Sequence, residues 1–284
     1  MRDNPKTLLV TGASKGIGEA CALHFARQGH TVFAGYRQPA DGERLRREGG
    51  ENLIPLRLDV GRDEDIRQMA AHIGEIVGDA GLYGLVNNAG VAVPGPVEFL
   101  PMAEIRRQFE VNLFGQIAVT QACMPLLRKA KGRVVNMSSV SGKFVYPFFG
   151  PYAMSKHALE AFSDALRREL LPWGMHVASI EPGSIQTPIW ENTVARSDRS
   201  FEDFPQAAHE YYGKTFAKVK AGSLDSGRNG LAAGAVVRVV EKALFSPRPK
   251  ARYIVGKNAR RVIQLQRILP DGFFDWVVER FLYP

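Results

Sequence analysis

Three side chains near the middle of the chain have the types and spacing needed to move a proton at an oxygen atom. Tyr152 and Lys156 stand four residues apart, and Ser139 precedes them at the end of an apolar run. Residues four apart share one face of a helix, so the hydroxyl and the ammonium can meet. A free tyrosine has a pKa of about 10, and a nearby cation favours the phenolate. We therefore expect Lys156, together with a positively charged oxidised cofactor, to favour the phenolate of Tyr152, and Ser139 to donate to the same substrate oxygen, as in proton exchange at a carbonyl or alcohol.

A glycine-rich turn follows the first strand-like run, Thr7 to Thr11, and leads into an Ala-rich helical pattern. Glycines at such a turn let the backbone approach a pyrophosphate, and the helix N-terminus favours the negative charge. The spacing is Gly-x3-Gly-x-Gly and differs from the Gly-x-Gly-x-x-Gly of the common dinucleotide-binding motif. The alternative interpretation is an ordinary glycine-rich turn between a strand and a helix. The residues predicted to hold a dinucleotide here are Gly12, Ser14, Lys15, Gly16, Ile17 and Gly18.

The end of the second strand indicates which dinucleotide is bound. An NAD enzyme presents a carboxylate there to the ribose 2′-hydroxyl, whereas this chain has Gly35, Tyr36 and Arg37. A guanidinium can bind a 2′-phosphate through charge-assisted hydrogen bonds, and Lys15 can add a second cation. NADP(H) is favoured over NAD(H); the alternative is that both cations are ordinary surface residues.

Two more polar runs follow predicted strands. Asp59 and Val60 end the third strand and Asn87-Asn88-Ala89-Gly90 ends the fourth, at the edge where open α/β sheets bind ligands. Asp59 is expected either to accept a hydrogen bond from the adenine amino group or to be the N-cap of the next helix. We include Asp59, Val60, Asn88, Ala89 and Gly90 among the predicted cofactor residues.

The elements that position these residues alternate between short apolar runs and helical stretches. Such a rhythm predicts a single doubly wound Rossmann-type α/β domain over residues 1–284, with a central parallel sheet of about seven strands and helices on both faces. A polar and aromatic stretch, about 189–230, interrupts the rhythm and is expected to be an insertion that covers the substrate. The strand candidates are Thr7–Thr11, Thr31–Gly35, Leu53–Leu58, Leu82–Asn87, Gly132–Ser138, His176–Glu181 and Tyr253–Val255; the helix candidates are Gly16–Gln28, Asp63–Val77, Leu231–Leu244 and about 258–281, broken at Pro270.

Composition limits the class of protein. The chain has 45% hydrophobic and 23% charged residues, as a folded globular protein does, and its two cysteines, Cys21 and Cys123, are expected to be reduced core residues. No secretion signal is recognisable, which favours a cytoplasmic location. The six histidines form no ligand set, so no metal is predicted, and His157 is expected at the surface.

The formal charge of +8 is concentrated near the C-terminus. Residues 248–267 contain Lys and Arg but no Asp or Glu. Three interpretations remain open: a solvated face, a patch attracted to anionic lipid, and a nucleic-acid surface, of which the last lacks any accompanying motif. We expect no nucleic-acid partner and leave open a weak association with a membrane surface.

Taken together, these motifs resemble the short-chain dehydrogenase/reductase family over residues 6–190. The resemblance rests on the glycine turn, the run from Asn87 to Gly90, Asn112, Ser139, Tyr152, Lys156 and Pro182-Gly183. It implies that Asn112, Ser139, Tyr152 and Lys156 are catalytic, with Asn112 holding a water that links Lys156 to solvent. It also implies that Tyr152, Lys156, Pro182, Gly183, Ile185 and Thr187 contact the cofactor, the last two at the nicotinamide carboxamide. A homodimer or homotetramer is expected through the two long helices after strands four and five.

Residues 152–189 resemble the branch that contains 17β-hydroxysteroid and retinol dehydrogenases. The branch suggests a bulky apolar alcohol or ketone, which the aromatic loop from Phe144 to Phe149 would suit, although these aromatics are also typical of core. Two further alternatives stay open: the same chemistry on a small polar carbonyl or acyl thioester, and a dinucleotide-binding regulator without turnover.

Overall fold

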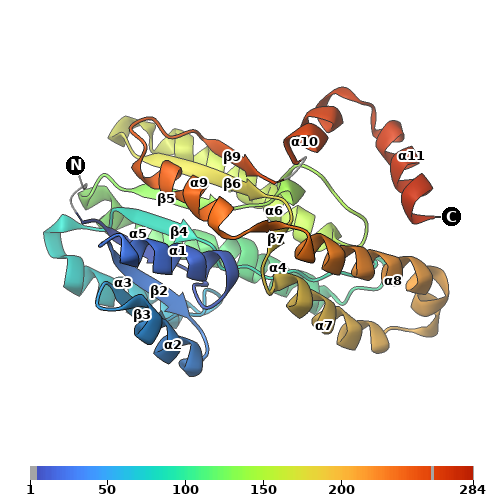
Figure 1. Cartoon of the computed structure of the whole chain (residues 1–284), viewed down its shortest axis with the longest axis horizontal. Helices are drawn as coiled ribbons and strands as arrows, with labels where there is room; N and C mark the ends of the chain where they lie inside the picture. Colours follow the sequence, from blue (N-terminus) through green and yellow to red (C-terminus); the bar gives the residue numbers. More distant parts are fainter. Residues whose placement is uncertain (1–4, 257–258, 284) are drawn as a thin grey trace.

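The structure, a computed structural model, describes residues 5–256 and 259–283 and is built on a parallel sheet of seven strands (Figure 1). The strand order is β3-β2-β1-β4-β5-β6-β9, and every pairing in it is parallel. The chain starts in the middle of the sheet, builds outward to β3, and crosses back to β4, so the order reverses between β1 and β4. The strands are β1 Thr7–Val10, β2 Thr31–Tyr36, β3 Leu53–Arg57, β4 Gly84–Asn87, β5 Arg133–Met137, β6 His176–Pro182 and β9 Arg252–Val255.

Helices cover both faces of the sheet, as predicted for a doubly wound fold. On one face lie α1 (Gly16–Arg27), α2 (Pro39–Gly49) and α9 (Gly234–Phe245); on the other lie α3 (Asp63–Val77), α5 (Gly115–Lys129) and α6 (Gly150–Glu169). Strands between two helical layers must be apolar on both sides, which explains why Leu8, Leu9 and Val10 have no exposed surface.

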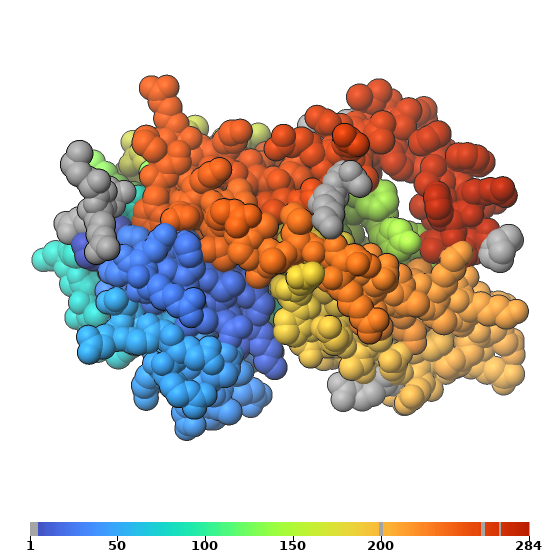
Figure 2. All heavy atoms as spheres, in the orientation of Figure 1, coloured from blue at the N-terminus to red at the C-terminus, as the bar shows by residue number. Residues whose placement is uncertain are grey.

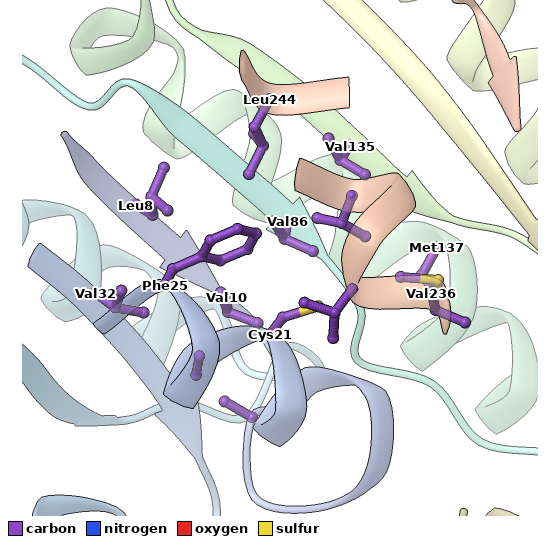
Figure 3. Close-up of a cluster of buried hydrophobic side chains, with 14 of the residues drawn as sticks. Leu8, Val10, Cys21, Phe25, Val32, Val86, Val135, Met137, Val236 and Leu244 are labelled. Carbon is purple, nitrogen blue, oxygen red and sulfur yellow. The ribbon is translucent and has the colours of Figure 1, made fainter. Parts of the chain in front are cut away.

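The core under α1 and α9 shows how the layers are joined (Figure 3). Phe25 of α1 points between β1 and α9, and its ring lies edge-on to Phe245 with centroids 5.9 Å apart. Cys21 packs one turn earlier in the same cluster and is a free thiol, as is Cys123 of α5 on the other face of the sheet, so both cysteines are the buried, reduced residues predicted. Burying a large apolar side chain of this kind contributes about 1.5–3 kcal/mol.

The stretch after residue 185 differs most from what the sequence predicted. Residues 189–228 form two helices, α7 (Ile189–Glu202) and α8 (Gln206–Arg228), and the predicted helix from Leu231 begins only at Gly234, after a two-residue strand. That strand, β8 (Leu231–Ala232), pairs with β7 (Ile185–Gln186) and so brings the end of α8 back to the sheet.

The C-terminal segment forms α10 (Ala259–Ile268) and α11 (Asp271–Leu282), with the predicted break at Pro270. Leu282 is buried against Phe148 and Phe216, so α11 packs on the protein's own body. Its outer side and the end of α10 remain exposed: Ile268 is 79%, Trp276 58% and Phe281 70% exposed. Figure 2 shows the two helices as a red arm with a hollow between it and the body. Within the described ranges, no helix has both the length and the apolar composition to cross a membrane.

Candidate functional site

A cleft of about 520 Å³ runs along the carboxyl ends of the strands, at the reversal between β1 and β4. Ligands bind at this position in open α/β sheets. Almost every residue that the sequence singled out lines it: Gly12, Ser14, Lys15, Gly16, Ile17, Arg37, Asp59, Val60, Asn88, Ala89, Gly90, Ser139, Tyr152, Lys156, Pro182, Gly183, Ile185 and Thr187. Gly18 and Asn112 lie behind this lining instead.

The glycine turn is closed tightly against the loop after β4. Gly12 has a φ of +61°, and a Cβ there would lie 2.8 Å from the Cα of Ala89. A Cβ on Gly18 would lie 2.4 Å from both the Asn88 side-chain nitrogen and the Gly12 carbonyl oxygen. Lys15 is the N-cap of α1 and its side chain does not cap the helix. The first N–H groups of α1 therefore remain available to an anion in the cleft, which fits a dinucleotide pyrophosphate.

Thr11 and Asn88 fix this turn to the neighbouring loop. The Thr11 hydroxyl accepts hydrogen bonds from the backbone nitrogens of Asn88 and Ala89, at 2.9 and 3.0 Å. The Asn88 amide donates in return to the carbonyls of Thr11 and Gly12, both at 3.0 Å. Asn88, expected to touch the cofactor, thus also holds the glycine turn in shape.

Ser139, Tyr152 and Lys156 meet at the centre of the cleft. Lys156 is 4% exposed; its Nζ donates to the carbonyl of Met137 at 2.7 Å and lies 5.7 Å from the centroid of the Tyr152 ring. Ser139 follows β5, where its hydroxyl reaches the carbonyl of Pro182 at 3.4 Å and shares a hydrogen bond with the Tyr152 hydroxyl. The helix α6 presents Tyr152 and Lys156 on one face, as their spacing predicted.

Lys156 alone does not lower the pKa of Tyr152, and the expected effect of an oxidised nicotinamide on this pKa stays a prediction. Burial raises the pKa of the Tyr152 phenol above its ordinary value, and the hydrogen bond with Ser139 only partly offsets this. Lys156 is affected as well: burial lowers the pKa of its ammonium to about 8, against the attraction of Glu160. The sequence pattern showed which charges would lie together, but it did not show how completely the site is withdrawn from water.

Asn112 belongs to a row of amide side chains that holds the loop 89–93. Gln108, Asn112 and Gln116 are each fully buried and each bonds to this loop. Asn112 accepts from the nitrogen of Val91 at 2.8 Å and donates to its carbonyl at 2.9 Å. A π-helical turn, η2 (Glu110–Phe114), carries Asn112 between α4 (Met102–Phe109) and α5. Such turns are frequent at functional sites. The sequence analysis missed the two glutamines, although amides four and eight residues apart were the available signal.

At the other end of the cleft, Lys15 and Arg37 are exposed side chains on its wall, as predicted. The proposal that Asp59 caps a helix is wrong, because α3 begins at Asp63 with Arg62 as its N-cap. Asp59 lies on the cleft wall, and its Oδ1 accepts from the nitrogen of Gly61 at 3.1 Å. Of the two roles expected for Asp59, only the one at the cofactor remains.

A pair of buried carboxylates behind the site was not predicted. Glu160, 4% exposed, lies one turn after Lys156 on α6, and Glu181, 1% exposed, is the last residue but one of β6, directly before Pro182. Arg252 of β9 donates to Glu160 at 2.8 Å but lies 3.5 Å from the nearer oxygen of Glu181.

The pKa values of the two carboxyl groups are shifted in opposite directions. Burial opposes ionisation of Glu160, but hydrogen bonds with Ser179, Arg252 and Lys143 outweigh it and hold its pKa below the ordinary value. Burial and the neighbouring charge of Glu160 raise the pKa of Glu181 to about 7. Between about pH 4.5 and 7, Glu181 therefore keeps a proton that an exposed glutamate would have released.

Three of the aromatic residues in the loop 144–149 and the insertion are core. Phe148, Phe204 and Phe216 are buried between α8, α7 and the loop before α6. Trp190 is different: it lines the cleft, and its indole nitrogen donates to the carbonyl of Ile185 at 2.7 Å. His157 is exposed, as predicted.

Comparison with known proteins agrees with this geometry. Residues 6–198 match the family described as short chain dehydrogenase. The chain is 35% identical over 272 residues to an NADPH-dependent 3-dehydrocapnine reductase of Ornithobacterium rhinotracheale, covering 94% of both chains. It is 34% identical to mouse estradiol 17-beta-dehydrogenase 2, covering 98% of this chain and 75% of the mouse protein. A short-chain dehydrogenase structure from Streptomyces avermitilis superposes with a TM-score of 0.77 at 27% identity, covering 98% of this chain and 94% of the other.

Proposed function

Because the chain belongs to the short-chain dehydrogenase/reductase family, whose members act on alcohol and carbonyl groups, we propose that it is an NADP(H)-dependent oxidoreductase with Tyr152 as its acid and base. One observation carries the proposal. The Tyr152 hydroxyl, the Ser139 hydroxyl and the Lys156 ammonium converge in a cleft that also contains the glycine turn.

The cleft fits a dinucleotide with a 2′-phosphate. When bound, NADP(H) supplies or accepts the hydride. The N-terminus of α1 and the glycine turn would hold its pyrophosphate, Asp59 and Val60 its adenine, and Ile185 and Thr187 its carboxamide. Arg37 and Lys15 would face the 2′-phosphate, and the residues at the end of β2, Gly35 to Arg37, include no carboxylate to oppose it. The 3-dehydrocapnine reductase, which is similar over nearly its whole length, is named as NADPH-dependent.

The chain's own groups account for the proton. In reduction Tyr152 gives its proton to the carbonyl oxygen while the Ser139 hydroxyl donates a hydrogen bond to that same oxygen; in oxidation Tyr152 takes the proton back. Lys156, held by the Met137 carbonyl, stabilises the phenolate that remains. Asn112 is the fourth catalytic residue of the proposal, in the position from which it would hold a water near Lys156. Its observed bonds to Val91 also fix the wall of the site.

The substrate of the proposal is a bulky apolar alcohol or ketone of steroid- or retinoid-like size. Ile189 and Trp190 of α7 line the cleft beside Thr187, so the substrate side is partly apolar. The estradiol dehydrogenase to which the chain is similar acts on a substrate of this class. On this proposal residues 1–284 form one Rossmann-type domain, with α7 and α8 covering the substrate.

The proposal also includes the oligomeric state and the cellular location of the protein. Exposed apolar residues on the helices after strands four and five, including Phe114 and Met154, support a homodimer or homotetramer through these helices. The exposed face of α10 and α11 supports weak contact with a membrane surface, and we propose a cytoplasmic location.

The test is a panel of alcohols and ketones, from small and polar to steroid-sized, incubated with NADPH or NADP⁺ and followed by absorbance of the reduced nicotinamide. We expect turnover that increases with apolar substrate size and disappears in Tyr152→Phe. Turnover of only the small polar members would refute the substrate class. Binding of NADPH with no turnover of any member would instead favour a regulator.

A further inference from the structure

A second cavity of about 350 Å³ borders the cleft near Arg37 and Asp59, and the residues shared by the two linings include two guanidinium groups. Arg37 from the end of β2 and Arg107 from α4 line both the cleft and the second cavity. Asp59 and Val111 also line both. Arg106, the neighbour of Arg107, lines only the second cavity.

Arg107 is a cation with unused bonding capacity. It is half-buried, and its Nη1 is shielded from solvent without a hydrogen-bond partner among the described residues. Burial and the neighbouring guanidinium of Arg196 lower the pKa of Arg107, with Arg37 acting in the same direction. Leaving a buried donor unbonded costs about 1–3 kcal/mol, and more for a charged group.

Two of the acidic residues nearby are bonded to other groups. Glu104 lies one turn before Arg107 on α4, but Arg196 of α7 engages both of its oxygens at 2.7 and 2.8 Å. Asp59 accepts from the backbone of Gly61 through one oxygen. The second cavity itself is lined by three guanidinium groups, of Arg37, Arg106 and Arg107, and by two carboxylates, of Asp59 and Glu110, so its described lining carries an excess of positive charge.

An excess of guanidinium groups on two sides of a cavity suits a phosphate monoester, which offers three acceptor oxygens and up to two negative charges. On the basis of the proposed function, we infer that Arg107 binds the 2′-phosphate of NADP(H) together with Arg37. The preference for NADP(H) is then set from two elements, the end of β2 and the helix α4, and not from the end of β2 alone.

The experiment measures binding to the purified full-length protein by calorimetry, with 2′,5′-ADP and 5′-AMP as probes that differ only in the 2′-phosphate. Arg107→Met is the test variant and Arg106→Met its matched control. For Arg107→Met we expect affinity for 2′,5′-ADP to fall by about ten-fold or more, as for loss of one charge-assisted contact, and affinity for 5′-AMP to change less than about two-fold. Arg106→Met should bind both probes as the wild type does.

The outcomes separate this inference from the proposed function. If the wild type binds both probes equally, the NADP(H) assignment and the role of Arg107 both fail. If Arg37→Met loses selectivity for 2′,5′-ADP but Arg107→Met keeps it, the cofactor assignment stands and Arg107 is not a ligand. Equal loss of both probes in Arg107→Met also rejects the phosphate contact. Circular dichroism checks the fold of each variant, and Arg107→Gln replaces Arg107→Met if the latter does not fold.

Discussion

Replacing Glu181 by Gln should stabilise the protein, by about 1 kcal/mol in mildly acidic solution and by about 3 kcal/mol in alkaline solution. Glu181 is 1% exposed, and the cation nearest to it is already bonded to Glu160. Its pKa is raised from an ordinary value of 4.5 to about 7, mainly by burial. Glutamine has nearly the shape of the protonated side chain and carries no titrating group, so it removes the cost of ionising this position.

The magnitude follows from the shift in pKa. Between pH 4.5 and about 7 the folded protein retains a proton that the unfolded chain has released, so the free energy of unfolding falls as the pH rises. Above about pH 7 both states are ionised and the loss is complete. A shift of about 2.5 pKa units amounts to about 3 kcal/mol, of which about 2 kcal/mol is lost between about pH 5.5 and 8.5.

The assay is urea or thermal unfolding of the wild type and Glu181→Gln at about pH 5.5, 7 and 8.5, without cofactor. Glu169→Gln, which removes an exposed carboxylate from the end of α6, is the control for the change in net charge. The advantage of Glu181→Gln should grow by about 2 kcal/mol across this range, a rise in the difference of Tm of at least about 4 °C. A constant difference, or a variant that loses stability as the pH rises, would refute the assignment of the proton to Glu181.

Four other outcomes are expected. Tyr152→Phe should keep its fold and its cofactor affinity and lose more than about nine-tenths of its turnover, measured as kcat, since only the transferable proton is removed. Lys156→Ala should lower kcat and also weaken NADPH binding in a fluorescence titration; unchanged affinity would remove its contact with the cofactor. Gly18→Ala should lower Tm by several degrees and weaken NADPH binding, because its methyl group would overlap the Gly12 carbonyl. The exposed apolar residues of α11, together with the exposed cations Arg260 and Arg261 of α10, should make the protein sediment with anionic vesicles at low salt more than with neutral ones. Trp276→Ser with Phe281→Ser should abolish this binding; equal, negligible sedimentation of the wild type with both lipids would refute the membrane proposal.

The strands and the cofactor side of the site were predictable because their signals are local. A buried parallel strand must be apolar, and a glycine turn between strand and helix allows few conformations, so Leu8 to Gly18 could be placed without the fold. The relation between Tyr152 and Lys156 depends only on helix geometry and was predicted for the same reason.

The features that the sequence did not predict depend on contacts between distant segments. Gln108 and Gln116 acquire their role only because the loop after β4 folds over α4 and α5. The raised pKa of Tyr152 and of Glu181 is a consequence of burial, which no spacing rule measures. In the sequence, Arg107 could not be told from other arginines of predicted helices. Its role depends on the fold, because Arg196 of α7 occupies Glu104, the carboxylate one turn away from Arg107.

The position of β9 in the sheet has a consequence for the nascent chain on the ribosome. Strand β6 is complete at Pro182, but the strand that covers its outer edge is not made until Arg252–Val255, about 70 residues later (Figure 1). Translation adds about 5–20 residues per second, so the N–H and C=O groups of this edge of β6 stay unpaired for roughly 4–14 s. An unpaired strand edge can form hydrogen bonds with another chain and so promote aggregation. An inward-pointing charge and a proline are features that blunt such edges, and β6 carries both in Glu181 and Pro182. The carboxylate that lowers stability in the finished protein thus stands where it discourages aggregation during synthesis.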